Sequence, residues 1–305
     1  MACSFYGDPS ASLSVVGVTG TNGKTTTTFL LESIFSRCGK TPGVIGTVGH
    51  RLGHRLLEKA GNTTPPSLEL QRLLARMREG GATHVAMEVS SHGLALKRAD
   101  EVSFDAAVLT NIARDHLDFH KTPEAYFDAK ARLFDLLTRP SSPKPVRVAV
   151  LNKDDASCAR LQRLISGAQV ATFGFGEGAD FRACGNALTL EGATFRLSHA
   201  GRESAIRVRL IGRHNLRNAL GAAAAAWSLG LPEAGIIEGL AALKRVPGRL
   251  EPVEAGQGFS VFVDFAHTED ALMAVLDSLR SLTRRRIITV FGCGGERDAG
   301  KRGPM

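Results

Sequence analysis

The sequence has no apolar stretch long enough to span a bilayer, and Met1 is followed by a short polar segment instead of a charged head with an apolar run. We therefore expect neither a membrane anchor nor a signal peptide. Cysteine is sparse, and the five cysteines are scattered along the chain without a CxxC pair. We predict free thiols, which are typical of proteins in the reducing cytoplasm.

Aromatic residues are also few, at 6% of the chain. The net charge of +8 is spread out, with Arg284–Arg286 as its only tight basic run. Nucleic-acid binding favours clustered positive charge with interleaved aromatic residues, so we expect no nucleic-acid partner. A solvated surface and small substrates that carry phosphate explain the charge better. The 305 residues, 43% of them hydrophobic, suffice for one large or two ordinary domains.

One segment carries the densest chemical signal. Residues 15–28 read VVGVTGTNGKTTTT, an apolar run that enters a glycine turn, followed by a lysine and the hydroxyl-rich start of a helix. The N–H groups of such a turn and of the helix N-terminus bind phosphate oxygens. Lys24 can reach the terminal phosphates, and Thr25 can place its hydroxyl on Mg²⁺. The strict phosphate-loop pattern requires glycine where this chain has Val18, so a plain glycine-rich turn stays an alternative on this motif alone.

From Leu13 onward, short β-rich runs alternate with amphipathic stretches. This alternation predicts an α/β fold with a P-loop-type, mostly parallel sheet and helices on both of its faces. We predict strands over 14–18, 84–89, 105–110, 146–151 and 169–173, and helices over 24–37, 67–79, 123–137 and 154–165.

The pattern then changes. Residues 180–210 indicate a small antiparallel β insertion, with turns at Glu191-Gly192 and near Gly201. Helices are predicted over 214–229 and 232–243.

Val246-Pro247-Gly248 breaks the pattern and predicts a domain boundary. A strand over 259–266, a helix over 268–281 and a strand over 285–292, before the loop GCGGERDAGKR, indicate the start of a Rossmann-like C-terminal domain. The predicted division is a linker at 1–12, a central domain at 13–245 and a partial second domain at 246–305.

Polar residues lie at or just beyond the carboxyl ends of two predicted strands, at the sheet edge where ligands of parallel sheets bind. Glu88, in MEVSSH, is suited to holding magnesium directly or through water, or alternatively to capping the next helix. His116 lies in TNIARDHLD, where four polar or ionisable side chains crowd one loop, and it is a candidate metal ligand or phosphate contact.

Two further sets have ordinary alternatives. Lys130, in AYFDAKARLF, is a solvated helix lysine on spacing alone. Asn215 and Asn218 share one helix face at a spacing of i and i+3, where two amides can contact a purine edge or simply cap the helix.

Taken together, these segments resemble the Mur ligase family. GTNGKTT, NTTP, MEVSSH, TNIARDHLD, AYFDAKARLF, GRHNLRNALGAA, PGRLE and DFAHTEDAL occur in the order typical of that family. The subtype that the chain resembles most is MurE, and FYGDPS and FGCGGERDAGKR strengthen that likeness. Phe265 and Glu269 depart from the usual tyrosine and proline of the last motif.

The resemblance implies roles for single residues, in an ATP- and magnesium-dependent enzyme with two metal sites. Lys24, Glu88, His116 and Lys130 would be catalytic. Thr25 and Glu88 would bind one magnesium, and His116 with Lys130, carbamylated to N6-carboxylysine, would bind the second. ATP would contact Gly20, Thr21, Asn22, Gly23, Lys24, Thr25, Thr26, Asn215, Asn218, Arg249, Asp264 and His267. The UDP-muramoyl dipeptide would contact Asn62, Thr63, Thr64, Ser90 and Arg98.

The implied reaction is ATP-dependent amide formation in peptidoglycan synthesis. It adds meso-diaminopimelate or L-lysine to UDP-N-acetylmuramoyl-L-alanyl-D-glutamate through an acyl phosphate. We expect a monomer that lacks the N-terminal domain and most of the C-terminal domain of the family. Two alternatives stay open, a folylpolyglutamate synthase-like ligase and a truncated fragment that binds ATP without ligating.

Overall fold

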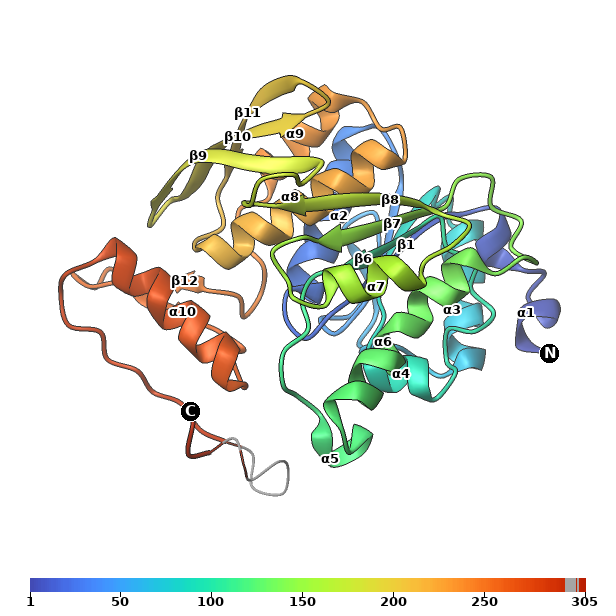
Figure 1. Cartoon of the computed structure of the whole chain (residues 1–305), viewed down its shortest axis with the longest axis horizontal. Helices are drawn as coiled ribbons and strands as arrows, with labels where there is room; N and C mark the ends of the chain where they lie inside the picture. Colours follow the sequence, from blue (N-terminus) through green and yellow to red (C-terminus); the bar gives the residue numbers. More distant parts are fainter. Residues whose placement is uncertain (294–299, 301) are drawn as a thin grey trace.

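The computed structural model describes residues 1–293, 300 and 302–305. Its centre is an eleven-stranded sheet in the order β11-β10-β9-β8-β7-β6-β1-β5-β2-β3-β4 (Figure 1). Neighbouring strands are parallel along the run β9-β8-β7-β6-β1-β5-β2, and antiparallel strands extend both ends of the sheet. Its strands are β1 (Ser14–Thr19), β2 (Pro42–Ile45), β3 (His50–Leu52), β4 (Arg55–Glu58), β5 (His84–Glu88), β6 (Ala106–Leu109), β7 (Val148–Asn152), β8 (Gln169–Gly174), β9 (Phe181–Thr189), β10 (Gly192–His199) and β11 (Arg202–Val208).

Helices cover both faces of this sheet (Figure 1). One face carries α2 (Lys24–Arg37), α8 (Arg213–Ser228) and α9 (Glu233–Ala242), and the other carries α3 (Ser67–Glu79), α6 (Pro123–Thr138) and α7 (Cys158–Leu164). Short helical turns are α1 (Ala2–Phe5), η1 (Pro9–Ala11), α4 (Ser91–Ala95) and α5 (Leu117–His120). Successive strand side chains point to opposite faces, so Val16 and Val18 pack with the first layer and Val15 with the second.

The predicted α/β architecture is confirmed, with some differences. All five predicted parallel strands form, as do the helices 24–37, 67–79 and 123–137. Helix α7 begins at Cys158 instead of 154, because the carboxylate of Asp155 binds the amide of Ser157 in a turn. The predicted hairpin turns are present, and β9 pairs in parallel with β8, so the antiparallel insertion continues the main sheet. The β3–β4 hairpin was not predicted.

The C-terminal segment differs from its prediction. It contains a separate antiparallel pair, β12 (Glu251–Val253) with β13 (Val261–Val263), and then α10 (Glu269–Leu282). The strand predicted over 285–292 is wrong, because these residues form no strand and Val290 is 94% exposed. A second parallel strand would need β13 as a neighbour and a helix layer over its own side chains. Most of the loop predicted after it lies outside the described residues.

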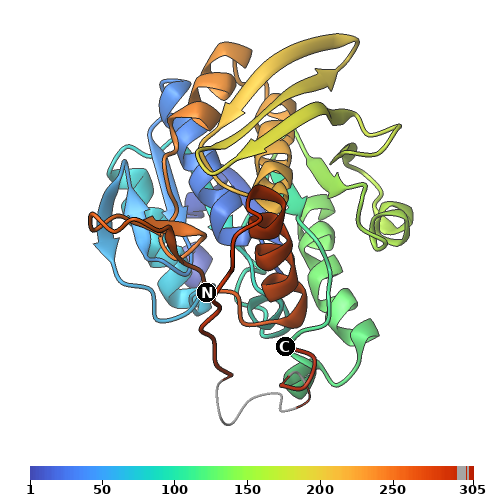
Figure 2. The same ribbon diagram turned by 90° about the vertical axis from the view of Figure 1, so that its left-hand side faces the viewer.

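Specific contacts join α10 and the hinge before it to the large sheet domain. The Ser278 hydroxyl of α10 lies 3.3 Å from Nδ1 of His214 at the start of α8. Arg249, in the hinge, donates to the Thr25 hydroxyl at the start of α2 at 3.2 Å. Figure 2 shows the β9–β11 hairpins and the C-terminal residues at opposite ends of the molecule. The division of the chain at residue 246 stays a prediction.

Candidate functional site

The candidate site lies where the central strands end. β1 has β5 on one side and β6 on the other, although β2 follows β1 in the chain, so the chain changes direction across the sheet at this point. Open parallel sheets bind ligands beyond the carboxyl ends of their strands at such a switch. The segments that leave β1, β5 and β6 carry most of the residues predicted for the site.

The loop after β1 requires glycine at both of its ends. Gly20 has φ +144°, and a Cβ atom there would lie 1.9 Å from the Thr110 hydroxyl. Gly23 has φ +91°, and its Cβ would lie 2.3 Å from Oδ1 of Asn218. Asn111 fixes the loop between them, since its Oδ1 accepts from the amide of Asn22 and its Nδ2 donates to the carbonyl of Asn22, both at 3.0 Å. The backbone is therefore held in one conformation before any ligand binds.

Lys24 opens α2 and turns back over this loop. Its Nζ donates to the carbonyls of Gly20 at 2.8 Å and Thr21 at 2.9 Å. Burial lowers the pKa of Lys24, and the negative charge of Glu88 opposes this shift. A polyphosphate in the loop would favour the charged amine further. Thr26, which is also predicted to contact ATP, is buried in the first turn of α2.

Thr25 and Glu88 form the best-defined candidate for a magnesium site. The Thr25 hydroxyl donates to Oε2 of Glu88 at 3.0 Å, and Glu88 is 1% exposed. Thr47 after β2 donates its amide and its hydroxyl to the same carboxylate, at 2.9 and 3.1 Å. Hydroxyl and carboxylate oxygens are the ligands that Mg²⁺ prefers. The donor set therefore fits a hard cation beside the phosphate loop.

His116 begins α5 with φ +52°, and its ring is 3.2 Å from the Asp115 carboxylate. Its ring also packs edge-on against His92, with the centroids 4.7 Å apart. Burial lowers the pKa of His116 to about 4, against the opposing charge of Asp115. The imidazole is therefore neutral at pH 7, which is the form that binds metals.

Lys130 is not the solvated lysine that its spacing suggests. It is 2% exposed on α6, and its Nζ donates to the Gly20 carbonyl at 2.8 Å, the same oxygen that Lys24 uses. Its amine also lies 4.4 Å from the ring centroid of Tyr126. Burial lowers the pKa of Lys130 well below its ordinary value, and the charge of Lys24 adds to this.

The residues predicted to contact a muramoyl substrate fall into two groups. Thr64 is fully buried, and its hydroxyl accepts from the amide of Ser90 at 2.9 Å and donates to the carbonyl of Glu88 at 3.0 Å. Arg98 donates to the carbonyl of Thr64 at 2.9 Å. These residues anchor the loop that precedes α3, while Asn62 on the same loop is exposed. Thr63 reaches back to Thr47, with the two hydroxyls 3.0 Å apart.

The predicted asparagine pair lies on α8. Nδ2 of Asn218 donates to Oδ1 of Asn215 at 3.2 Å, and Asn215 donates to the carbonyl of Ile211 at 2.8 Å. Both residues are buried. The side chain of Asn218 lies against the turn at Gly23, so this pair packs against the phosphate loop.

Three predicted nucleotide residues come from the hinge and the C-terminal segment. Arg249 donates to the Thr25 hydroxyl at 3.2 Å and so joins the site. Asp264 accepts from the amides of Leu250 and Ala266, both at 2.7 Å, and this fixes the hinge backbone. His267 is exposed, and its Nδ1 is 2.9 Å from the carbonyl of Phe265.

Sequence reasoning missed Thr47 and Tyr126. Thr47 follows Gly46, whose Cβ would lie 2.3 Å from Oε1 of Glu88. A Gly-Thr pair directly after a parallel strand was the available signal for it. The Tyr126 hydroxyl lies 3.0 Å from that of Thr21, a partner 105 residues away that no local pattern indicates.

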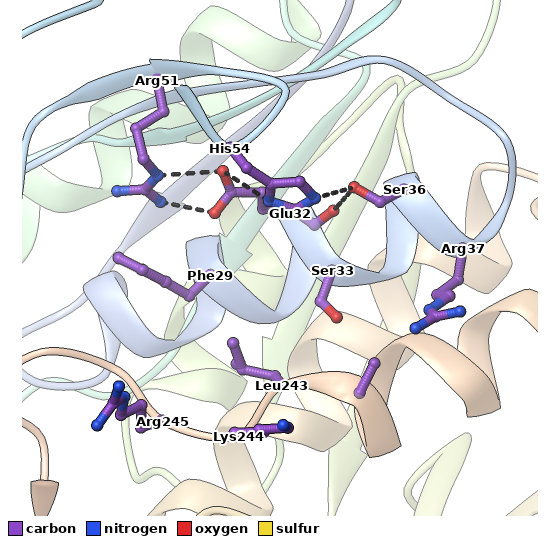
Figure 3. A pocket seen from close by; sticks show the side chains of 11 residues that line it. Phe29, Glu32, Ser33, Ser36, Arg37, Arg51, His54, Leu243, Lys244 and Arg245 are labelled. Atoms are coloured by element: carbon purple, nitrogen blue, oxygen red, sulfur yellow. Dashed lines mark hydrogen bonds and ion pairs between the residues drawn. The ribbon is translucent and has the colours of Figure 1, made fainter. Parts of the chain in front are cut away.

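One well-defined cavity lies away from these residues. It measures about 400 Å³ between α2, the β3–β4 hairpin and the segment 242–245 (Figure 3). Phe29, Arg51 and Lys244 line it, and no residue predicted for the site does. A second cavity of about 270 Å³ includes Arg249 in its wall.

Comparison with known families gives two matches. The Mur ligase middle domain matches residues 18–226, and the Mur ligase glutamate ligase domain matches residues 248–305. The UDP-N-acetylmuramoyl-L-alanyl-D-glutamate--2,6-diaminopimelate ligase of Geobacter sulfurreducens is 47% identical over 305 residues, 100% of this chain and 60% of that protein. The ligase of the same name from Listeria monocytogenes is 41% identical over 301 residues, 99% of this chain and 61% of its own length. The chain thus spans about three fifths of these relatives.

Solved structures agree with these matches. A structure of a ligase of that name has a TM-score of 0.78 and 34% identity, over 96% of this chain and 59% of the other. Folylpolyglutamate synthase of Mycobacterium tuberculosis, complexed with ADP and AMPPCP, has a TM-score of 0.75 at 19% identity, over 92% of this chain and 69% of the other, and shows a common fold alone. Within the described residues, no helix has the length and apolar character needed to cross a bilayer.

Proposed function

Because this chain belongs to the Mur ligase family, we propose that it is the central part and the start of the C-terminal part of a MurE-type ligase. The intact protein would join a diamino acid to UDP-N-acetylmuramoyl-L-alanyl-D-glutamate at the expense of ATP. One observation carries the proposal: Lys24, Thr25 and Glu88 converge at the ends of β1 and β5, where a triphosphate and its magnesium would lie. We also propose that it acts in the cytoplasm as a monomer, and its free cysteines support that compartment.

The proposed reaction has two steps. The D-glutamyl carboxylate attacks the γ-phosphorus of ATP, the bond from this phosphorus to the β,γ-bridging oxygen breaks, and ADP leaves as the acyl phosphate forms. The amine of the diamino acid then attacks the acyl carbon, the C–O bond to phosphate breaks, and the amine loses a proton. The first step brings a carboxylate toward a triphosphate, so its barrier is dominated by repulsion between two anions. Preorganised positive charge and N–H donors offset this repulsion, and Lys24 with the start of α2 supplies both.

Two groups of residues would hold magnesium. Thr25 and Glu88 offer oxygen ligands for the first ion. For the second, the neutral ring of His116 is available, while the amine of Lys130 is a poor partner for a hard cation. Its low pKa leaves a free amine that can add CO₂, forming an N–C bond and releasing one proton, which gives a carbamate with two oxygens. Magnesium supplies charge neutralisation at the phosphates when it is bound. Intact-mass measurement tests for the carbamate at Lys130.

The remaining predicted contacts belong to the same proposal. Asn62, Thr63 and Ser90 lie on the segments beside Glu88 and would contact the muramoyl dipeptide. Arg249 and His267 would contact the nucleotide from the hinge side. Asp264 and Thr64 would act by fixing the backbone around these contacts, because their polar atoms are already used within the protein.

The decisive experiment compares Lys24→Ala with Lys40→Ala in a chain extended to the length of the relatives. Lys40 is an exposed lysine beyond the end of α2 and serves as the matched control. We expect Lys24→Ala to reduce ADP formation by at least about 10²- to 10³-fold and Lys40→Ala to leave it unchanged. Unchanged turnover in Lys24→Ala would remove the phosphate-loop assignment.

A substrate panel separates the alternatives. Product from the UDP-muramoyl dipeptide and a diamino acid supports the proposal. Product from a folate and glutamate, with none from the muramoyl substrate, would favour the folylpolyglutamate synthase class, whose fold this chain shares. Calorimetric ATP binding to the 305-residue chain without phosphate release would identify it as a nucleotide-binding fragment.

A further inference from the structure

We propose that His50, Glu58 and Glu69 form a separate binding site for one divalent transition-metal ion, with Zn²⁺ as the cation that suits its ligands best. One ligand atom from each of these residues lies within 4.8 Å of the other two. None of the three belongs to the phosphate loop or to the magnesium candidates. The site would therefore be structural, with no ligand in common with the proposed ATP chemistry.

His50 is the observation that points to a ligand. The residue is 0% exposed, and neither of its ring nitrogens has a hydrogen-bond partner among the described residues. A buried imidazole nearly always satisfies at least one nitrogen, because an unpaired buried polar atom keeps its full desolvation penalty. A cation between His50 and the two carboxylates would give one of these nitrogens a partner.

The fold brings the three ligands together from three elements. His50 and Glu58 are paired across the antiparallel strands β3 and β4, and a register shift follows directly after His50. Glu69 lies in the first turn of α3, on the same face of the sheet. Arg51, the next residue of β3, points to the opposite face, where it forms an ion pair with Glu32 of α2 at 2.7 Å (Figure 3). That ion pair fixes the strand so that His50 faces α3.

The ligand types select the class of cation. One imidazole and two carboxylates suit zinc with water as its fourth ligand, whereas Mg²⁺ prefers sites made mostly of oxygen ligands and water. Two ligands of one zinc ion can be at most about 4.2 Å apart, twice a bond of about 2.1 Å. The ligand atoms lie within 4.8 Å of one another, so a small inward shift of the side chains would close them around one ion. Exposed rotamers of Glu69 leave room for this shift, because Glu69 is only partly buried.

Two arginines would compete with the metal ion for the carboxylate of Glu58. Arg72 and Arg76 donate to Glu58 at 2.9 and 3.1 Å. Their side chains are 38% and 41% exposed, so water screens their charges. Metal-bound carboxylates are commonly hydrogen-bonded by outer residues, and the arginines can keep that role.

Occupancy of this site would steady the active-site loops. Thr47, which binds the carboxylate of Glu88, precedes His50 by three residues. Glu58 ends β4 just before the loop that carries Asn62 and Thr64. A metal bound by β3, β4 and α3 would thus fix both ends of the β3–β4 hairpin. This hairpin connects the segment at Thr47 to the loop that carries Asn62 and Thr64.

The test uses ZnCl₂ as the probe on the full chain, with Mg²⁺ in excess to fill oxygen-rich sites. Anomalous diffraction at the zinc edge should show a peak bonded to a ring nitrogen of His50 and to Glu58 and Glu69. In calorimetry, His50→Phe and Glu69→Gln should each lower zinc affinity by at least about tenfold. His54→Phe, at the exposed turn of the same hairpin, is the matched control and should bind zinc as the unchanged chain does.

Absence of the anomalous peak between these residues would overturn the proposal. Equal zinc affinity in Glu69→Gln and the unchanged chain would also overturn it, and this variant covers the case in which His50→Phe does not fold. ATP binding measured on the same samples reports on the phosphate loop. A failure there would concern the proposed function and not the zinc site.

Discussion

Replacing Gly20 with alanine should lower stability and nucleotide binding by more than the small size of the added methyl group suggests. The new Cβ would lie 1.9 Å from the Thr110 hydroxyl and 3.0 Å from the Asn111 carbonyl. A φ of +144° costs an L-residue about 1–3 kcal/mol. Thr110 must also move, which breaks its 2.6 Å hydrogen bond to the carbonyl of Asn22 and costs about 1 kcal/mol more. We expect a total loss of about 2–4 kcal/mol and a displaced phosphate loop.

Gly39→Ala is the matched control. Gly39 also has a positive φ, of +71°, but no heavy atom lies within 4 Å of its Cβ position, and it lies beyond the end of α2. Thermal unfolding should show that this variant loses only about 1 kcal/mol of unfolding free energy. Each kcal/mol lowers the melting temperature by about 2–4 °C.

Nucleotide binding separates the two variants further. Calorimetry with ATP and Mg²⁺ should show weaker binding by about 10²-fold in Gly20→Ala, because a loop displaced by about 1 Å no longer aligns its donors. Gly39→Ala should bind ATP normally. If both variants lost equal stability and bound ATP alike, the inferred crowding between Gly20 and Thr110 would be refuted.

Three further predictions concern other parts of the molecule. Burial lowers the pKa of His214 to about 4, so this residue contributes stability above about pH 6.5 that is lost as the pH falls toward 4. Denaturant titrations should show that the free energy of unfolding falls by about 2 kcal/mol by pH 5, and that His214→Gln lacks this loss. Equal pH profiles for the two proteins would contradict this. Thr64→Val should cost about 1–3 kcal/mol in the same assay, because the amide of Ser90 loses its buried acceptor, and a neutral result would remove the proposed anchoring role. Lys130→Met should keep or raise the melting temperature while it abolishes ligation in the extended chain; a large destabilisation would show that the amine stabilises the fold.

The fold was largely predictable because both of its layers leave a periodic signal. Each buried parallel strand is a short apolar run, and each covering helix has one apolar face. The β3–β4 hairpin was missed because its strands have only three and four residues, although Gly53-His54, both with positive φ, form the tight turn that the sequence could have indicated. The strand expected over 285–292 failed for the opposite reason. Its apolar pattern is present, but strand formation depends on a neighbour that lies elsewhere in the chain.

The candidate site was predictable only as a set of loops. The position of Glu88 at the carboxyl end of a strand placed it beside the phosphate loop, and the hydrogen bond from Thr25 agrees with that expectation. The environment of Lys130 could not be predicted, since its spacing on α6 is that of a surface lysine. Its burial depends on the contact of its Nζ with a carbonyl 110 residues away. Such long-range contacts follow from the packing of α6 against β1 and not from any local pattern.

The two lysines at the Gly20 carbonyl connect the energetics of the fold to its proposed chemistry. Lys24 and Lys130 both donate to this single oxygen at 2.8 Å, so two buried amines approach each other where the solvent cannot screen them. Burial lowers the pKa of both amines, and for Lys130 the charge of Lys24 adds to this effect. A neutral lysine adds little to stability, yet it is the form that can react with CO₂. Conversion of Lys130 to a carbamate would turn the repulsion into an attraction between an anion and Lys24, at the place where divalent cations are needed. The same burial that disfavours two charged amines therefore favours the form of Lys130 that can become a carbamate.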